Sequence, residues 1–349
     1  MKLNSGIGAA IGAAVLFGLS TPLAKLLLGS VSPLLLAGLM YLGSGLGLAT
    51  VLALRTATVR RTAITWPRGP AVGWLLAAIV SGGMLGPYLL MYGLRATDSA
   101  SASLILNLEG VLTALLAWFV FKENFDRRIA LGMGLIVAGG AILAIGPALR
   151  AQGLIGPLAI CGACLAWAID NNLTRKVSVH DAMFIACAKG LIAGASSVAL
   201  ALAAGARMPT LKVLLQAGSL GFVTYGLSLT LFVMALRALG TARTAAYFSL
   251  APFIGALLAV AIGAPLTPAL LFAGLLMAAG VWLHLTERHF HWHSHDPLRH
   301  EHTHVHDAHH RHRHGPDWDG REPHSHAHAH EPLAHSHAHY PDIHHRHDH

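Results

Sequence analysis

Charge is scarce over most of this 349-residue chain, and acidic residues are the scarcest of all. Charged residues make up 11% of the sequence, whereas a soluble domain carries roughly 25%. A segment with so little charge cannot cover a surface that faces water. This excludes a soluble globular domain and predicts an integral membrane domain whose main partner is the lipid bilayer. Before Glu287 the only acids are Asp98, Glu109, Glu123, Asp126, Asp170 and Asp181.

Cysteine is rare as well, since Cys161, Cys164 and Cys187 are the only three. Cys161 and Cys164 have the spacing of a redox pair, but no βαβ pattern surrounds them, so we expect them to pack as small residues. The apolar part contains no nucleophile–base motif, and we expect no enzymatic activity and no required cofactor. The net charge of +8 does not predict nucleic-acid binding, because most Arg and Lys residues lie in short loops between apolar segments.

Ten apolar segments have the length of about 20 residues that a membrane-spanning helix needs. If the N-terminus is inside, the inner segments carry twelve Lys and Arg residues and the outer loops carry four. This asymmetry predicts an all-α, multi-pass protein of the cell inner (plasma) membrane with both termini in the cytoplasm. The predicted helices cover residues 7–29, 33–54, 71–93, 99–121, 128–148, 154–177, 182–204, 213–235, 242–263 and 268–286.

The two halves of the apolar part resemble each other at a nearly constant offset. A shift of 142 places Leu94-Arg95-Ala96 on Leu236-Arg237-Ala238, and it places Gly132 on Gly274. Five helices per half is an odd number, so the halves must cross the membrane in opposite directions. Inverted repeats are typical of alternating-access transporters, which bind substrate between the repeats. We therefore predict repeats at 5–149 and 150–286, followed by a tail at 287–349.

Several short motifs carry a family resemblance. They are Gly93-Leu94-Arg95-Ala96, Leu108-Glu109-Gly110 and Phe121-Lys122-Glu123 in the first half, and Leu250-Ala251-Pro252 in the second. With these motifs the chain resembles the EamA-type ten-helix permeases of the drug/metabolite transporter superfamily. The usual Glu-Pro pair is divided here, because one half keeps the Glu and the other keeps the Pro. The resemblance implies a transport mechanism, but it leaves the cargo open among amino acids, metabolites, nucleotide sugars and toxic organic compounds.

Four ionisable residues fall inside predicted helices: Lys25, Glu109, Asp170 and Lys189. Each costs at least about 2.5–3.5 kcal/mol at a helix centre, so such residues normally face a cavity or a partner. Glu109 lies near the middle of its helix and is a candidate proton carrier or substrate contact. The alternative is a fixed acid that is hydrogen-bonded to the backbone or to Asn107. Its counterpart in the second half is Ala251, so the fold does not require an acid there.

Asp170 and Lys189 are predicted to lie at the same depth on neighbouring antiparallel helices, roughly 10 Å from the cytoplasmic edge. A structural ion pair is the preferred interpretation, and a gate or substrate contact is the alternative. Asn171 and Asn172 add amide groups beside Asp170. Trp167 lies one turn away and faces either the cavity or neighbouring helices and lipid.

The tail contains 23 of the 25 histidines, many of them at alternate positions. Neutral imidazole binds divalent transition metals, so we expect Zn, Ni, Co or Cu to bind here. The composition provides no apolar core, which predicts a disordered segment. The candidate ligands are His300, His302, His304, His306, His324, His326, His328, His330, His335, His337 and His339.

Together these features predict a secondary transporter of a small organic metabolite or toxic compound. We expect it to be driven by a proton or substrate gradient, with a metal-binding regulatory tail. The alternative is a divalent-metal permease or exporter that uses the tail. A metal sensor without transport activity is a third hypothesis, which the inverted repeat disfavours, and a homodimer is kept as an open alternative.

Overall fold

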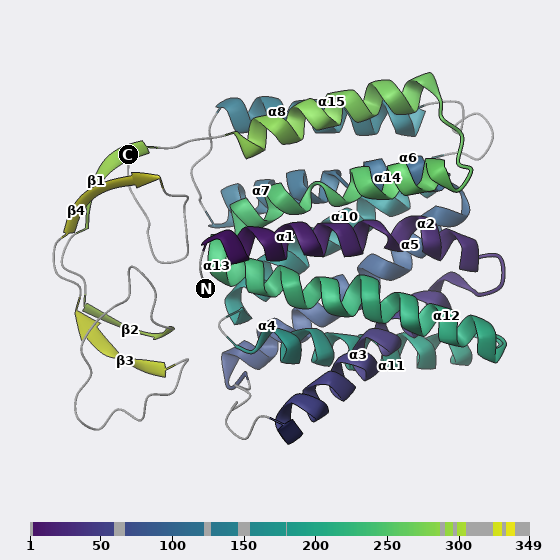
Figure 1. The fold of residues 1–349 in the computed structure, drawn as a ribbon, viewed down its shortest axis with the longest axis horizontal. Helices are drawn as coiled ribbons and strands as arrows, with labels where there is room; N and C mark the ends of the chain where they lie inside the picture. Colours follow the sequence, from purple (N-terminus) through teal and green to yellow (C-terminus); the bar gives the residue numbers. More distant parts are fainter. Residues whose placement is uncertain are drawn as a thin grey trace.

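The computed structural model describes residues 3–58, 67–121, 127–145, 154–178, 180–286, 290–295, 299–304, 324–329 and 333–338. All ten segments predicted to span the membrane are helical, several of them in two or three pieces (Figure 1). In the first half the helices are α1 (Leu3–Gly18), α2 (Ser20–Leu27), α3 (Pro33–Thr58), α4 (Pro70–Ala78), η1 (Ile79–Leu85), α5 (Gly86–Arg95), α6 (Ser99–Ile105), α7 (Leu108–Phe121) and α8 (Arg127–Ile145). In the second half they are α10 (Ile155–Val177), α11 (Ala182–Ala203), α12 (Leu211–Gly221), η2 (Phe222–Leu227), α13 (Ser228–Phe248), α14 (Ala251–Ala261) and α15 (Pro268–Leu285).

Length and composition suit these helices to a bilayer. Within the described residues, seven helical segments are long and apolar enough to cross a membrane, and two shorter apolar stretches lie in α8 and α15. The remaining helix, α10, carries Asp170, Arg175 and Lys176. Large apolar side chains face outward, such as Leu257 at 73% and Leu275 at 70% exposure, as lipid-facing residues would. The protein is an all-α integral membrane protein, as the sequence predicts.

Helix irregularities recur in the two halves at nearly the predicted offset. The π-helices η1 and η2 start at Ile79 and Phe222, which are 143 residues apart. A break separates α6 from α7 after Ile105, and a second break separates α13 from α14 after Phe248, again 143 residues later. Pro252 explains the second break, because proline lacks an N–H and disfavours helical geometry in the residue before it.

The first membrane-spanning segment is broken too. α1 ends at Gly18 and α2 begins at Ser20, with Pro22 in the first turn of α2. Pro22 accounts for this break, since proline has no N–H for the hydrogen bond that would continue α1.

The helix contacts are also paired between the halves. α1 packs against α13 and α14, whereas α10 packs against α5 and α7; α3 packs against η2, whereas α11 packs against η1. α3 contacts its counterpart α11, and α8 contacts its counterpart α15 (Figure 1). Glycine permits the close approach of α3 and α11, because a Cβ on Gly190 would lie 2.5 Å from the backbone nitrogen of Gly45.

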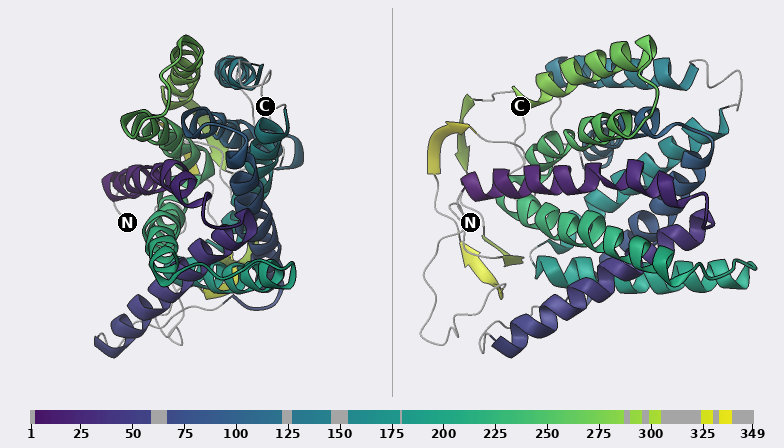
Figure 2. Two further views of the ribbon diagram at one scale, coloured as in Figure 1. Left: turned by 90° about the vertical axis from the view of Figure 1, so that its right-hand side faces the viewer. Right: turned by 45° about the vertical axis from the view of Figure 1, so that its right-hand side comes forward.

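The start of α1 and the end of α15 lie at the same end of the helix bundle, as Figure 1 and the right-hand view of Figure 2 show. Beyond α15 the structure describes four short strands: β1 (Phe290–His295), β2 (Arg299–His304), β3 (His324–Ala329) and β4 (Leu333–Ala338). β1 pairs with β4 and β2 pairs with β3, both antiparallel. A pattern that alternates histidine with other residues has the two-residue period of a β-strand, which accounts for the position of these strands. The expectation of a disordered tail stays a prediction.

Candidate substrate site

Glu109 lies at the start of α7, directly after the break that separates it from α6. Its backbone N–H donates to the carbonyl of Leu106 at 3.0 Å, so the chain turns through the break instead of continuing α6. The first turn of a helix has unpaired N–H groups and the positive end of the helix dipole, both of which favour a carboxylate there. The break therefore provides a polar environment for an acid that is 9% exposed.

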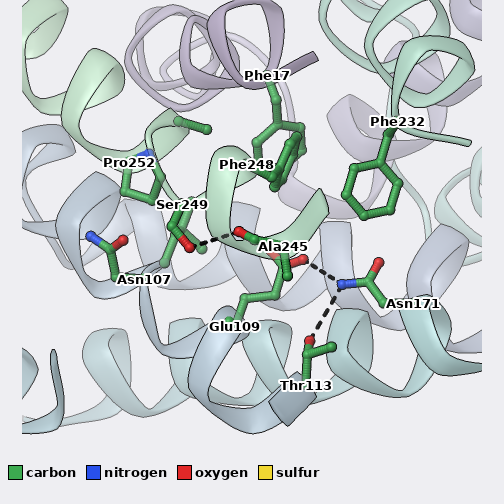
Figure 3. A pocket seen from close by; sticks show the side chains of 13 residues that line it. Phe17, Asn107, Glu109, Thr113, Asn171, Phe232, Ala245, Phe248, Ser249 and Pro252 are labelled. Atoms are coloured by element: carbon green, nitrogen blue, oxygen red, sulfur yellow. Dashed lines mark hydrogen bonds between the residues drawn. The ribbon is translucent and has the colours of Figure 1, made fainter. Parts of the chain in front are cut away.

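The side chain of Glu109 is held by an amide from α10 (Figure 3). Asn171 donates from Nδ2 to Glu109 Oε1 at 2.8 Å, and more weakly to Thr113 Oγ1 at 3.4 Å. Among the described residues, no Lys, Arg or His forms an ion pair with Glu109. The alternative hydrogen bond to Asn107 is wrong, because Asn107 Nδ2 donates to the carbonyl of Leu104 in the preceding turn.

Asp170 and Lys189 form the ion pair that their equal depth predicts. Lys189 Nζ lies 2.5 Å and 2.7 Å from the two carboxylate oxygens of Asp170, and it also donates to Thr174 Oγ1 at 3.1 Å. Lys189 is 1% exposed and Asp170 is 5% exposed. A buried pair with this many hydrogen bonds compensates both charges. Whether the pair also gates transport stays a prediction.

The π-helix η1 supports the same site through the carbonyl of Gly82. Trp167 Nε1 and Tyr41 Oη both donate to this oxygen at 2.9 Å. In η1 the N–H of Gly86 donates to the carbonyl of Ser81, five residues earlier. The corresponding partner of Gly82 would be Pro87, which has no N–H, so the carbonyl of Gly82 remains available to the side chains. The shared acceptor fixes the orientation of both rings. Trp167 is buried, and it both borders the larger cavity and packs against Phe17 of α1, so its role in substrate binding stays a prediction.

Phe17 is the centre of an aromatic cluster that the sequence did not reveal. Its ring centroid lies 5.7 Å from that of Trp167, 6.0 Å from that of Tyr225 and 5.3 Å from that of Phe248. Two further contacts of 4.9 Å extend the cluster, from Tyr225 to Tyr41 and from Phe248 to Phe232. These distances are typical of interacting aromatic rings. The aromatic cluster is Phe17, Tyr41, Trp167, Tyr225, Phe232 and Phe248.

Two adjoining cavities of different size lie between the halves of the molecule. The larger is lined by the aromatic cluster together with Glu109 and Asp170. The smaller lies between the two helix breaks, where Asn107 and Gly110 face Ser249 and Pro252 (Figure 3). The shared lining residues are Phe17, Glu109, Asn171, Phe232 and Phe248.

Most of the residues singled out in the sequence line these cavities, but two do not. Asn172 turns away, because its Nδ2 donates to the carbonyl of Ala168 at 2.9 Å within its own helix. Lys189 lies behind Asp170 and reaches the cavity only through that residue. Neighbouring positions on a helix point in different directions, so a run such as Asp170-Asn171-Asn172 cannot all face one cavity.

The metal-binding expectation for the tail stays a prediction. The described residues contain no group of three or more His, Cys, Asp or Glu side chains that could hold a metal ion. Of the eleven candidate ligands, three lie outside the described residues, and the others are found in β2, β3 and β4. The backbone register sets His300 opposite His328, and His302 opposite His326. The three outside are His306, His330 and His339.

Comparison with known proteins agrees with this architecture. An uncharacterized transporter of Methanothermobacter thermautotrophicus is 27% identical, over 78% of this chain and 84% of the relative. The uncharacterized transporter YyaM of Bacillus subtilis is 23% identical, over 78% of this chain and 92% of the relative. A shorter match at 37% identity covers 20% of this chain and 61% of ArnE from Pseudomonas fluorescens, a probable 4-amino-4-deoxy-L-arabinose-phosphoundecaprenol flippase subunit.

A solved crystal structure has the same fold, with a TM-score of 0.62 and 19% identity, over 82% of this chain and 98% of that chain. The model of the EamA-like transporter family matches residues 4–145 and again residues 154–286, which together cover most of the chain. This protein belongs to the EamA-like transporter family.

Proposed function

We propose that the protein is a secondary transporter of a small organic compound and that its substrate binds in the two cavities beside Glu109. The observation that carries the proposal is the position of Glu109, an acid with no ionic partner among the described residues, between two helix breaks and beside cavities that lie between the halves. Placing an ionisable residue inside a membrane domain costs free energy, and such residues are characteristic of substrate and ion pathways. Broken helices near the middle of the membrane commonly form transport sites.

Alternating access is supported by the paired architecture. Each contact of α1 with a helix of the second half has a counterpart that α10 makes with a helix of the first half. The π-helices and the helix breaks follow the same relation. We therefore propose two inverted repeats, at residues 5–149 and 150–286, that rock against each other around the cavities. We further propose that both termini lie in the cytoplasm, following the distribution of positive charges.

Glu109 is proposed as the coupling residue. A carboxyl group can bind and release a proton, and the one at Glu109 borders both cavities, where substrate would compete with the proton for it. Asn171 keeps the carboxyl in place in either state, because its amide can hydrogen-bond a carboxylate or a carboxylic acid. A proton or substrate gradient would thereby drive transport.

An uptake screen in proteoliposomes tests the proposal. Pools of small organic compounds are offered to vesicles that contain the full chain, to vesicles with Glu109→Gln and to empty vesicles, with a proton gradient of either sign. The expected result is gradient-dependent accumulation of at least one compound by the full chain alone. Equal uptake by all three preparations across chemically diverse pools would contradict the proposal.

The tail supports a second, accessory function in metal binding. Its strands set histidines opposite one another, as His304 opposite His324 and His293 opposite His335, and opposed histidine positions suit a shared divalent ion. We propose that bound Zn, Ni, Co or Cu regulates transport. Metal as the cargo is the alternative, and the aromatic character of the cavities favours an organic cargo instead.

A further inference from the structure

We infer that the cavities select a small organic cation, such as an amine or quaternary ammonium group joined to an apolar substituent. This inference rests on the proposed transport function and names the class of substrate. Three independent features of the cavities support it: their charge, the polarity of their hydrogen-bonding groups and their aromatic lining.

The charge of the larger cavity is negative when Glu109 is ionised. Two carboxyl groups line it, but Lys189 already compensates Asp170 at 2.5 Å and 2.7 Å. Glu109 receives only a neutral amide, from Asn171. No Lys or Arg is among the described residues that line either cavity. A bound cation would supply the missing partner, whereas a bound anion would meet like charge in a medium that screens it weakly.

The hydrogen-bonding groups that remain available are mainly acceptors. Asn107 uses its Nδ2 to donate to Leu104, and its Oδ1 is buried without a partner. Asn171 uses its Nδ2 to donate to Glu109 and Thr113, so its carbonyl oxygen remains. Together with the carboxyl oxygens of Glu109, these groups match a ligand that carries N–H donors or a diffuse positive charge. A ligand rich in acceptors would leave them unsatisfied.

The aromatic cluster provides the third feature. Six rings from α1, α3, α10, η2 and α13 line the larger cavity together with Glu109. The faces of such rings attract cations, and cages of this composition recognise quaternary ammonium groups. Two of the rings are held rigidly, because Trp167 and Tyr41 share the carbonyl of Gly82. The Tyr225 hydroxyl is buried without a partner and provides one further polar contact.

Three probes of similar size and different charge test the inference. Benzyltrimethylammonium is a cation, neopentylbenzene is its neutral isostere, and benzenesulfonate is an anion. Their binding to the purified full chain is measured by isothermal titration calorimetry, and their transport is measured in proteoliposomes. We expect the cation to bind at least about tenfold more tightly than either of the others, which corresponds to about 1.4 kcal/mol. Equal or tighter binding of the neutral or anionic probe would overturn the inference, without the need for any variant.

Phe17→Leu removes the central ring of the cluster without removing a hydrogen bond. We expect it to weaken binding of the cation about two- to thirty-fold, as the loss of a cation–π contact predicts, and to affect the neutral probe less. Phe272→Leu is the matched control, because Phe272 is 58% exposed on the outer surface of α15. If Phe17→Leu does not fold, Phe248→Leu at the edge of the cluster replaces it. Unchanged binding of the cation by a folded cluster variant would overturn the inference.

The same vesicles separate this inference from the proposed function. If a neutral or anionic compound is transported in a manner that depends on Glu109 and the cation is not, the substrate class is wrong and the transport function stands. If no compound of any charge is transported by folded protein, the proposed function itself fails. Transport of the cation that is lost in Glu109→Gln supports both.

Discussion

Glu109, Asp170 and Lys189 are all ionisable residues inside membrane-spanning helices, but their surroundings give them different roles. The carboxylate of Asp170 accepts hydrogen bonds from the ammonium group of Lys189 and the hydroxyl of Thr174. The carboxyl group of Glu109 accepts one hydrogen bond, from the amide of Asn171 at 2.8 Å. The difference follows from position, because Lys189 lies on the helix next to Asp170 while Glu109 faces an open volume. In the pair each charge satisfies the other, whereas the uncompensated acid is available to a ligand or a proton.

Replacing Glu109 by glutamine tests this distinction. Glu109→Gln keeps the size of the side chain and can still contact Asn171, but it cannot exchange a proton. Protein level and thermal stability should be retained, and gradient-driven transport should be lost together with its dependence on pH. The other titratable groups near Glu109 are Asp170 with its partner Lys189, Tyr41 and Cys164. Wild-type transport with unchanged pH dependence would assign Glu109 a purely structural role.

The ion pair predicts a different pattern for its own variants. Asp170→Asn or Lys189→Met alone leaves one buried charge without a partner and should cost about 3–5 kcal/mol of stability. The double variant Asp170→Asn with Lys189→Met removes both charges and should be less destabilised than either single variant. Thermal unfolding in detergent measures the difference. Purely additive losses would show that the two residues do not depend on each other.

At the scale of single elements, irregular helices position the site. η1 offers the carbonyl of Gly82 to two side chains, and the α6–α7 break places Glu109 at a helix start. In an uninterrupted α-helix, the carbonyl of Gly82 and the backbone N–H groups at the start of α7 would be used in hydrogen bonds within the helix. The close packing of η1 against α10 explains why glycine occupies position 82, because a Cβ there would lie 1.9 Å from Asp170 Oδ2.

Two glycine variants in the same membrane-spanning segment test the role of this close contact. Gly82→Ala should lower the thermal stability and the transport rate, since its methyl group would displace Asp170 or open the interface with α10. Gly73→Ala is the control, because a Cβ at Gly73 in α4 meets nothing within 4 Å. This control should be neutral or stabilising by up to about 1 kcal/mol, since alanine favours a helix over glycine. Equal effects of the two substitutions would contradict the account of Gly82.

At the scale of the whole molecule, the sequence predicts the apolar segments and the resemblance of the two halves. It does not predict which side chains point into the cavities. Hydropathy located all ten helices, and equal depth located the Asp170–Lys189 contact. The aromatic cluster could not be predicted from the sequence. Membrane helices are apolar on every side, so the spacing of apolar residues does not show which face points inward. η1 and η2 alter the rotation of their helices further, so positions such as Tyr225 could not be assigned to the cavity in advance.

The tail should be separable from the transport domain. A chain truncated after Arg288 is expected to fold and transport but to lose any response to added Zn²⁺ or Ni²⁺. Metal binding by the full chain should be present near neutral pH and lost below about pH 6, because protonated histidine cannot ligate a metal. Cellular metal content measured with intact, truncated and Glu109→Gln chains separates regulation from metal transport. A change that requires Glu109 but not the tail would favour metal as the cargo.

Access to the cavity from each side of the membrane tests the central claim most directly. The three native cysteines are replaced by alanine, and Ser249→Cys places one thiol beside Glu109 in the smaller cavity. Leu257→Cys is the lipid-facing control, since that residue is 73% exposed on α14. A membrane-impermeant thiol reagent is then applied to either face of oriented proteoliposomes. Alternating access predicts that Ser249→Cys reacts from both faces and that bound substrate protects it, while the control is not protected. Reaction from one face only, under every gradient and substrate condition, would contradict the account.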